Sequence, residues 1–131
     1  QVTDQRKSWK DGKVTIGIDS GAELSVWPPE LCPEIKTEPT DASRSGTKYF
    51  GPGDKVVPSL PYMGSRTYQL KNNGVTMSHK VHVVPVRKPL MATCDLNDAG
   101  YDVHLLAKRQ CYAEQVKTGQ ILKFERTGPQ N

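Results

Sequence analysis

Ten prolines and eleven glycines divide this chain of 131 residues into short apolar segments. Within the segments apolar residues mostly alternate with polar ones, and this period of two is typical of β-strands. A chain of this length is large enough for one core but not for two. We therefore expect a single all-β domain, residues 1–131, in which short strands are joined by turns.

Turn residues place the strands. The pair Asn73-Gly74 is among the strongest short hairpin signals, because both residues tolerate the positive φ angles of a two-residue turn. It predicts a hairpin between residues 67–70 and 75–86. The second of these strands has apolar residues on both faces, which favours a position inside a sheet. Further strands are expected at residues 14–18, 22–27 and 101–106, and a C-terminal hairpin at 112–124.

Two segments depart from the strand pattern. Residues 33–46 are polar and contain Pro, Ser and Thr, so they predict a long surface loop. The segment that starts at Thr93 predicts the one short helix, with the Thr93 hydroxyl as its cap. Leu96 and Ala99 would share one side of this helix, and Gly100 would supply its left-handed end.

Charge and cysteine content argue against several classes of protein. The net charge is +4, but no basic cluster is longer than two residues, so direct binding of nucleic acid is not expected. No apolar stretch reaches the roughly 20 residues of a membrane-spanning helix. Three cysteines without C-x-x-C spacing predict reduced thiols in an intracellular compartment, cytoplasmic or organellar. Because the chain starts at Gln1, we expect a processed or excised piece in which any targeting segment is not visible.

The stretch KVTIGIDSGAELSVWP, residues 13–28, places Asp-Ser-Gly-Ala between two apolar segments. In isolation Asp-Ser-Gly is typical of an ordinary turn, because Asp and Ser side chains bond to their own backbone. Here IGIDSGAELSVWP resembles the active-site loop of the retropepsin-like aspartic proteases, in which apolar residues precede Asp-Thr/Ser-Gly-Ala. In texture the chain is most similar to the protease domains of retrotransposon polyproteins.

Two later segments extend the resemblance over residues 13–106. A predicted hairpin at residues 48–57, with Gly51 and Gly53 at its tip, follows the aspartate at the distance of the family's substrate-covering flap. The segment KPLMATCDLNDAGYDVHL resembles the family's second signature, an apolar pair and a glycine followed by a short helix. Ala92 stands where that signature usually has glycine.

The resemblance implies a fold and an activity. The fold is a closed retropepsin-like β-barrel or sandwich with a flap hairpin and one short helix, extended by a C-terminal hairpin over residues 107–131. The activity is that of an aspartic endopeptidase, in which two carboxylates share one proton and activate water. Since the chain has one such motif, Asp19 would face Asp19 of a second copy in a homodimer. No metal or organic cofactor is needed, and the expected substrate is a polypeptide.

The resemblance also assigns roles to residues. Asp19 would be the catalytic carboxylate, Ser20 would form hydrogen bonds between the two loops, and Gly21 would let backbone approach the substrate. The predicted substrate-binding residues are Ala22, Tyr49, Phe50, Gly51, Gly53 and Ala92. Tyr49 and Phe50 would otherwise close the flap hairpin over its own core.

A different class of function stays open, because a fold can persist without its chemistry. The alternative is a catalytically silent domain that serves as an accessory subunit and binds other proteins in a larger assembly. Ala92, the extra C-terminal hairpin and the mild positive charge motivate it. His79 and His82 lie on opposite strand faces and are expected to be core or surface residues rather than metal ligands. Cys94 is expected to be a buried small residue, and Trp27 to serve packing.

Overall fold

A computed structural model describes residues 14–50, 59–107 and 110–124 of the chain. These residues form mostly short strands with two short helices, which confirms the all-β prediction. The elements are β1 (Gly17–Asp19), β2 (Val26–Trp27), α1 (Asp41–Ser45), β3 (Lys48–Tyr49), β4 (Leu60–Pro61), β5 (Gly64–Asn72), β6 (Val75–Val83), β7 (Leu90–Ala92), α2 (Thr93–Asp98), β8 (Tyr101–His104), β9 (Cys111–Gln115) and β10 (Ile121–Phe124).

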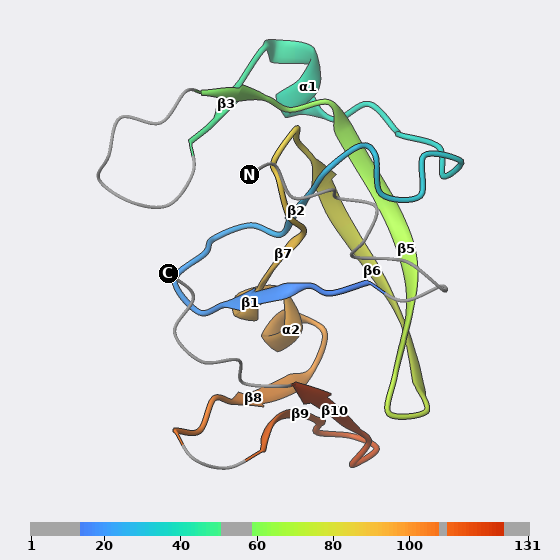
Figure 1. Ribbon diagram of the computed structural model, residues 1–131, viewed down its shortest axis with the longest axis vertical. Helices are drawn as coiled ribbons and strands as arrows, with labels where there is room; N and C mark the ends of the chain where they lie inside the picture. Colours follow the sequence, from blue (N-terminus) through green and yellow to red (C-terminus); the bar gives the residue numbers. More distant parts are fainter. Residues whose placement is uncertain (1–13, 51–58, 108–109, 125–131) are drawn as a thin grey trace.

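The largest sheet has five strands in the order β1-β7-β2-β6-β5 (Figure 1). The predicted hairpin at Asn73-Gly74 is confirmed as β5 and β6, and these turn residues have φ angles of 53° and 77°. β6 lies between β2 and β5, which confirms its interior position. β1 pairs in parallel with β7, and β2 pairs in parallel with β6. Segments far apart in the sequence therefore meet in the middle of this sheet.

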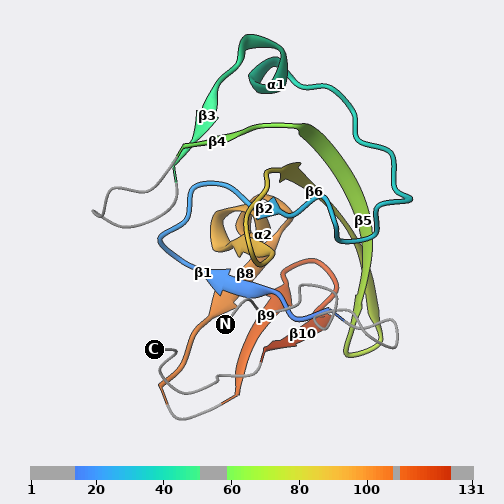
Figure 2. The same cartoon turned by 45° about the horizontal axis from the view of Figure 1, so that its top comes forward.

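Two smaller sheets complete the described structure. β8, β9 and β10 form an antiparallel sheet in the order β10-β9-β8, and this confirms the C-terminal hairpin, which has Gly119 at a φ of 74° in its turn. β3 pairs with β4 through Tyr49 and Leu60, so the second arm of the predicted flap hairpin lies later than residue 57. The tip with Gly51 and Gly53 lies outside the described residues. Figure 2 shows the β3–β4 pair at the opposite end of the molecule from the three-stranded sheet.

The described strands do not close into a barrel, contrary to the closed-barrel expectation. A closed barrel needs every strand to pair on both sides along a common shear. β2, β3 and β4 are two residues long and β1 and β7 are three, so they provide few ladder hydrogen bonds. The strands instead divide into three sheets.

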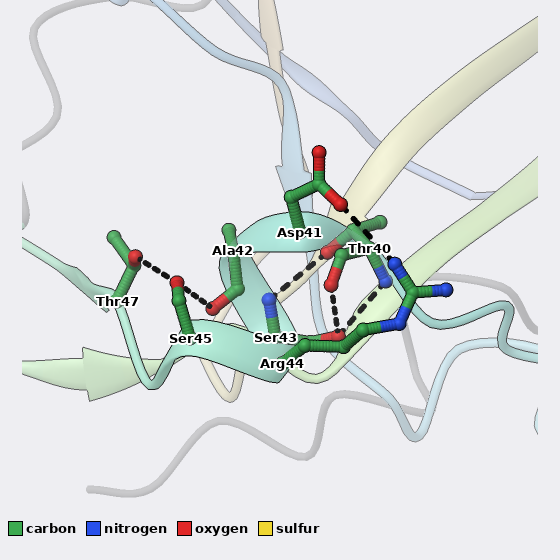
Figure 3. A network of polar contacts seen from close by, with 7 residues as sticks. All are labelled: Thr40, Asp41, Ala42, Ser43, Arg44, Ser45 and Thr47. Carbon is green, nitrogen blue, oxygen red and sulfur yellow. Dashed lines mark hydrogen bonds and ion pairs between the residues drawn. The ribbon is translucent and has the colours of Figure 1, made fainter.

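The helices differ from the prediction in two respects. The expected loop 33–46 contains α1, whose residues are not buried and so leave no apolar period in the sequence. It is held by a capping box: the Thr40 and Ser43 side chains each accept a hydrogen bond from the other's backbone N–H (Figure 3). In α2 the cap position is Ala92 rather than Thr93, and it makes no side-chain cap bond. Gly100 has the expected left-handed conformation, with a φ of 91°.

One buried cluster joins the five-stranded sheet, the three-stranded sheet and α2. Trp27 and Leu96 are fully buried, and the Trp27 ring lies 4.3 Å from that of Tyr68 between centroids. The cluster also includes residues of the three-stranded sheet, such as Tyr101 and Leu122. Trp27 therefore serves packing, as expected, and α2 is fixed by its apolar residue Leu96. None of the described helices is long and apolar enough to span a membrane.

Candidate functional site at the end of strand β1

Asp19 is the last residue of β1, and its neighbour in the sheet is Ala92. The parallel register pairs Gly17 with Leu90, Ile18 with Met91 and Asp19 with Ala92. The register thus joins the Asp-Ser-Gly-Ala loop directly to the Leu90-Met91-Ala92 segment. Both segments end at the same edge of this strand pair, where the chain turns into a loop after Asp19 and into α2 after Ala92.

The loop after Asp19 fixes one oxygen of its carboxylate. The Gly21 N–H donates a hydrogen bond to Asp19 Oδ1 at 2.8 Å, and the Ala22 N–H lies 3.4 Å from the Asp19 carbonyl oxygen. No described residue forms a hydrogen bond with Asp19 Oδ2 or with the Ser20 hydroxyl, and Ser20 and Gly21 are exposed. The turn therefore orients the carboxylate through Oδ1, and the described residues leave Oδ2 without a hydrogen bond.

The described contacts around Gly21 leave space for a side chain. A Cβ atom built on it would lie 3.4 Å from Asp19 Oδ1, which is an ordinary contact distance, and its φ angle is not in the left-handed region. Nothing within the described chain therefore demands glycine there.

Behind the loop lies a buried polar centre at Ser25, which the sequence did not indicate. Ser25 is 1% exposed. Its hydroxyl donates to Asp95 Oδ2 at 2.5 Å and accepts from the Ala92 N–H at 2.9 Å. Its carbonyl oxygen accepts from the His82 N–H at 3.0 Å. One serine thus connects β2 to β6, β7 and α2. The only sequence signal was a small polar residue next to the buried pair Val26-Trp27.

A second contact joins α2 to the loop. The Cys94 Sγ–H points toward the Glu23 and Ala22 carbonyl oxygens, at 3.4 and 3.8 Å. Cys94 is exposed, so the expectation of a buried small residue is wrong. It is wrong because α2 buries Leu96 and turns Cys94 outward. Cys32 is partly buried, and neither Cys32 nor Cys94 forms a disulfide with a described residue.

Aromatic rings connect β3 to β6. Tyr49 and Tyr62 meet edge to face at 6.1 Å between centroids, and Tyr62 meets His82 at 5.2 Å. Burial, followed by Tyr62 and then by the Asp19 charge, raises the pKa of Tyr49. Phe50 is 69% exposed and therefore does not close the hairpin over a core. Sequence reasoning named Tyr49, gave no role to Tyr62, and expected His82 to be a core or surface residue.

The two histidines of β6 differ in burial. Burial lowers the pKa of His79, which is 6% exposed, and the charge of Asp95 opposes this effect. Burial also lowers the pKa of half-buried His82, with Asp95 again in opposition and Lys80 in support. His79 Nε2 and His82 Nδ1 are buried without a hydrogen-bond partner. His79 is thus a core histidine, as expected. The described residues contain no group of three side chains placed to hold a metal ion.

The remaining predicted residues are buried or half-buried, or lie outside the described range. Ala92 is fully buried, so its position favours support of Asp19 from behind over contact with a substrate. Ala22 is half-buried beside the loop. Gly51 and Gly53 lie outside the described residues. A cavity of about 400 Å³ lies between α1 and the β5–β6 hairpin, lined by charges of both signs, and Asp19 does not line it.

Comparison with known proteins adds no relative. A scan against protein-family models gives no match, and a search of curated proteins finds none. The function must therefore be argued from the site itself.

Proposed function

We propose that the chain is an aspartic endopeptidase of the retropepsin type, active as a homodimer on extended polypeptide. The observation that carries the proposal is the Asp19 loop. One carboxylate oxygen accepts the Gly21 N–H at 2.8 Å, the other is left unbonded by the described residues, and the loop is seated on β7 at Ala92. This is an oriented carboxylate at a strand end, as general acid–base chemistry on a peptide requires.

The chemistry needs a second carboxylate. Two carboxylates a few Å apart cannot both ionise cheaply, so a facing pair holds one proton between them and titrates as a unit. The ionised member takes a proton from water while the protonated member polarises the peptide carbonyl. Asp95 does not fill this role within the chain, because its Oδ2 is bonded to Ser25 on the buried side of the loop. Asp19 of a second copy supplies the partner.

An edge strand and an exposed hydroxyl among the described residues leave room for two copies of the chain to pair. β8 is the last strand of its sheet, with β9 on one side and no described strand on the other. The exposed Ser20 hydroxyl, unbonded within the described chain, is free to bond across two loops. Tyr49 at the end of β3 and the exposed Phe50 after it would contact substrate side chains while the peptide backbone pairs with strand edges.

The test compares the chain with its Asp19→Asn variant, using Asp98→Asn as the control because Asp98 is an exposed carboxylate on α2. Cleavage of a mixed peptide library is measured across pH, with the oligomeric state followed by sedimentation. Asp19→Asn should lose cleavage and stay folded, whereas Asp98→Asn should behave like the parent chain. Cleavage by Asp19→Asn would refute the proposal.

Mixing the two chains tests the shared dyad. At equal amounts about one quarter of randomly paired dimers carry Asp19 on both sides, so activity should fall to about a quarter. A site complete within one chain would retain about half. A strict monomer without cleavage at every concentration would instead favour the accessory-subunit alternative.

A further inference from the structure

The buried Ser25–Asp95 pair lies directly behind the Asp19 loop. Ser25 directly precedes β2 and Asp95 is on α2, and their bond of 2.5 Å spans 70 residues of sequence. The Ala92 N–H, bonded to the same hydroxyl, belongs to the residue in register with Asp19. The chain of contacts therefore runs from Asp95 through Ser25 and Ala92 to the strand end that carries Asp19.

The direction of these hydrogen bonds is fixed. A backbone N–H only donates, so the Ser25 hydroxyl must accept from Ala92. The hydroxyl donates its own proton to Asp95 Oδ2. Hydrogen bonds to an ionised acceptor are about twice as strong as neutral ones. The charge of Asp95 thus strengthens the hydrogen bonds of the Ser25 hydroxyl, which accepts from the Ala92 N–H of β7.

From this geometry we infer that Ser25 and Asp95 are positioning residues for Asp19. They fix the position of β7. Because Asp19 pairs with Ala92 of β7, they also fix the position of the Asp19 carboxylate at the end of β1. This inference rests on the proposed function, because the separation of two facing carboxylates decides how they share a proton. A displacement of about 1 Å can reduce a rate by about 10²-fold.

The test uses Ser25→Ala, which removes the hydroxyl that connects Asp95 to Ala92, and Asp95→Asn, which retains a carbonyl acceptor. The matched controls are Ser45→Ala and Asp98→Asn, both at exposed positions. Ser25→Ala should lower kcat about 10- to 100-fold with little change in KM and should shift the pH–rate profile. Asp95→Asn should lose less, because the Ser25 hydroxyl still finds an acceptor. The controls should match the parent.

A readout independent of activity separates this inference from the proposed function. The titration of the Asp19 carboxyl is followed by carbon NMR, together with hydrogen exchange of the Ala92 amide. In Ser25→Ala both should change, even if no peptide is cleaved; absence of cleavage by the parent dimer would then overturn only the proposed function. If Ala92 exchanges faster while the Asp19 titration and the pH profile stay unchanged, the role of Ser25 is structural alone and the inference is wrong. If Ser25→Ala does not fold, the same readouts in Asp95→Asn decide: an Asp19 titration identical to that of Asp98→Asn overturns the inference.

Discussion

Truncation of Leu96 should destabilise the protein strongly and loosen the candidate site with it. Leu96 is the buried residue of α2 and is 0% exposed. Leu96→Ala removes three carbon atoms from the core, a transfer loss of about 2.4 kcal/mol at about 0.8 kcal/mol per group. The unfilled cavity adds to this, so we expect a total of about 3–4 kcal/mol. At this chain length that corresponds to a fall in Tm of about 10 °C or more.

The weakness of α2 makes this residue decisive. The helix has six residues, no side-chain cap and no basic residue in its last turn. Helices this short are marginal in water, so tertiary packing rather than propensity holds α2 in place. Loss of Leu96 should therefore also weaken the bond between Asp95 on this helix and Ser25.

Urea unfolding at neutral pH measures the effect. Leu105→Ala is the matched control, because Leu105 is 43% exposed and its truncation should cost less than about 1 kcal/mol. Leu96→Met preserves volume and should cost less than about 1.5 kcal/mol. If Leu96→Ala costs no more than Leu105→Ala, α2 does not depend on its buried leucine and the reasoning fails.

Burial favours the neutral form of His79 and lowers its pKa in the folded state. As pH drops below about 6.5, the unfolded chain gains the proton first, so the free energy of unfolding should fall. Urea midpoints from pH 7.5 to 5 should show a smaller fall in His79→Leu, and an equal fall would contradict this. Gly74→Ala should cost about 1–2 kcal/mol from its φ of 77° alone, since nothing lies within 4 Å of the added methyl. Gly64→Ala should cost clearly more, because its methyl would collide with the Glu38 carbonyl oxygen and lie 2.7 Å from Thr37; equal losses in thermal unfolding would show that the contact relaxes freely.

Local turn chemistry made the hairpins predictable. Asn73 and Gly74 adopt the positive φ angles that their residue types favour, and Gly119 does the same in the C-terminal turn. Two-sided apolarity likewise predicted the interior position of β6. These signals depend on neighbouring residues only, so one sequence is enough to detect them.

Features built from distant residues were not predictable in the same way. The Ser25–Asp95 bond joins two elements whose local sequences carry no trace of each other. α1 has no buried residue, so its only signal was the pair Thr40 and Ser43, easily taken for loop composition. The candidate site was located because Asp19 has a distinctive local motif, whereas its buried support depends on the fold.

The pairing of β1 with β7 has a consequence for how the protein folds. The hydrogen bonds that seat the Asp19 loop reach across 67 to 72 residues of sequence. Such contacts close large loops and form slowly compared with the β5–β6 hairpin. During synthesis, these hydrogen bonds therefore cannot form until β7 and α2 have left the ribosome. A nascent chain that ends before Leu90 has the aspartate but lacks the strand that holds it.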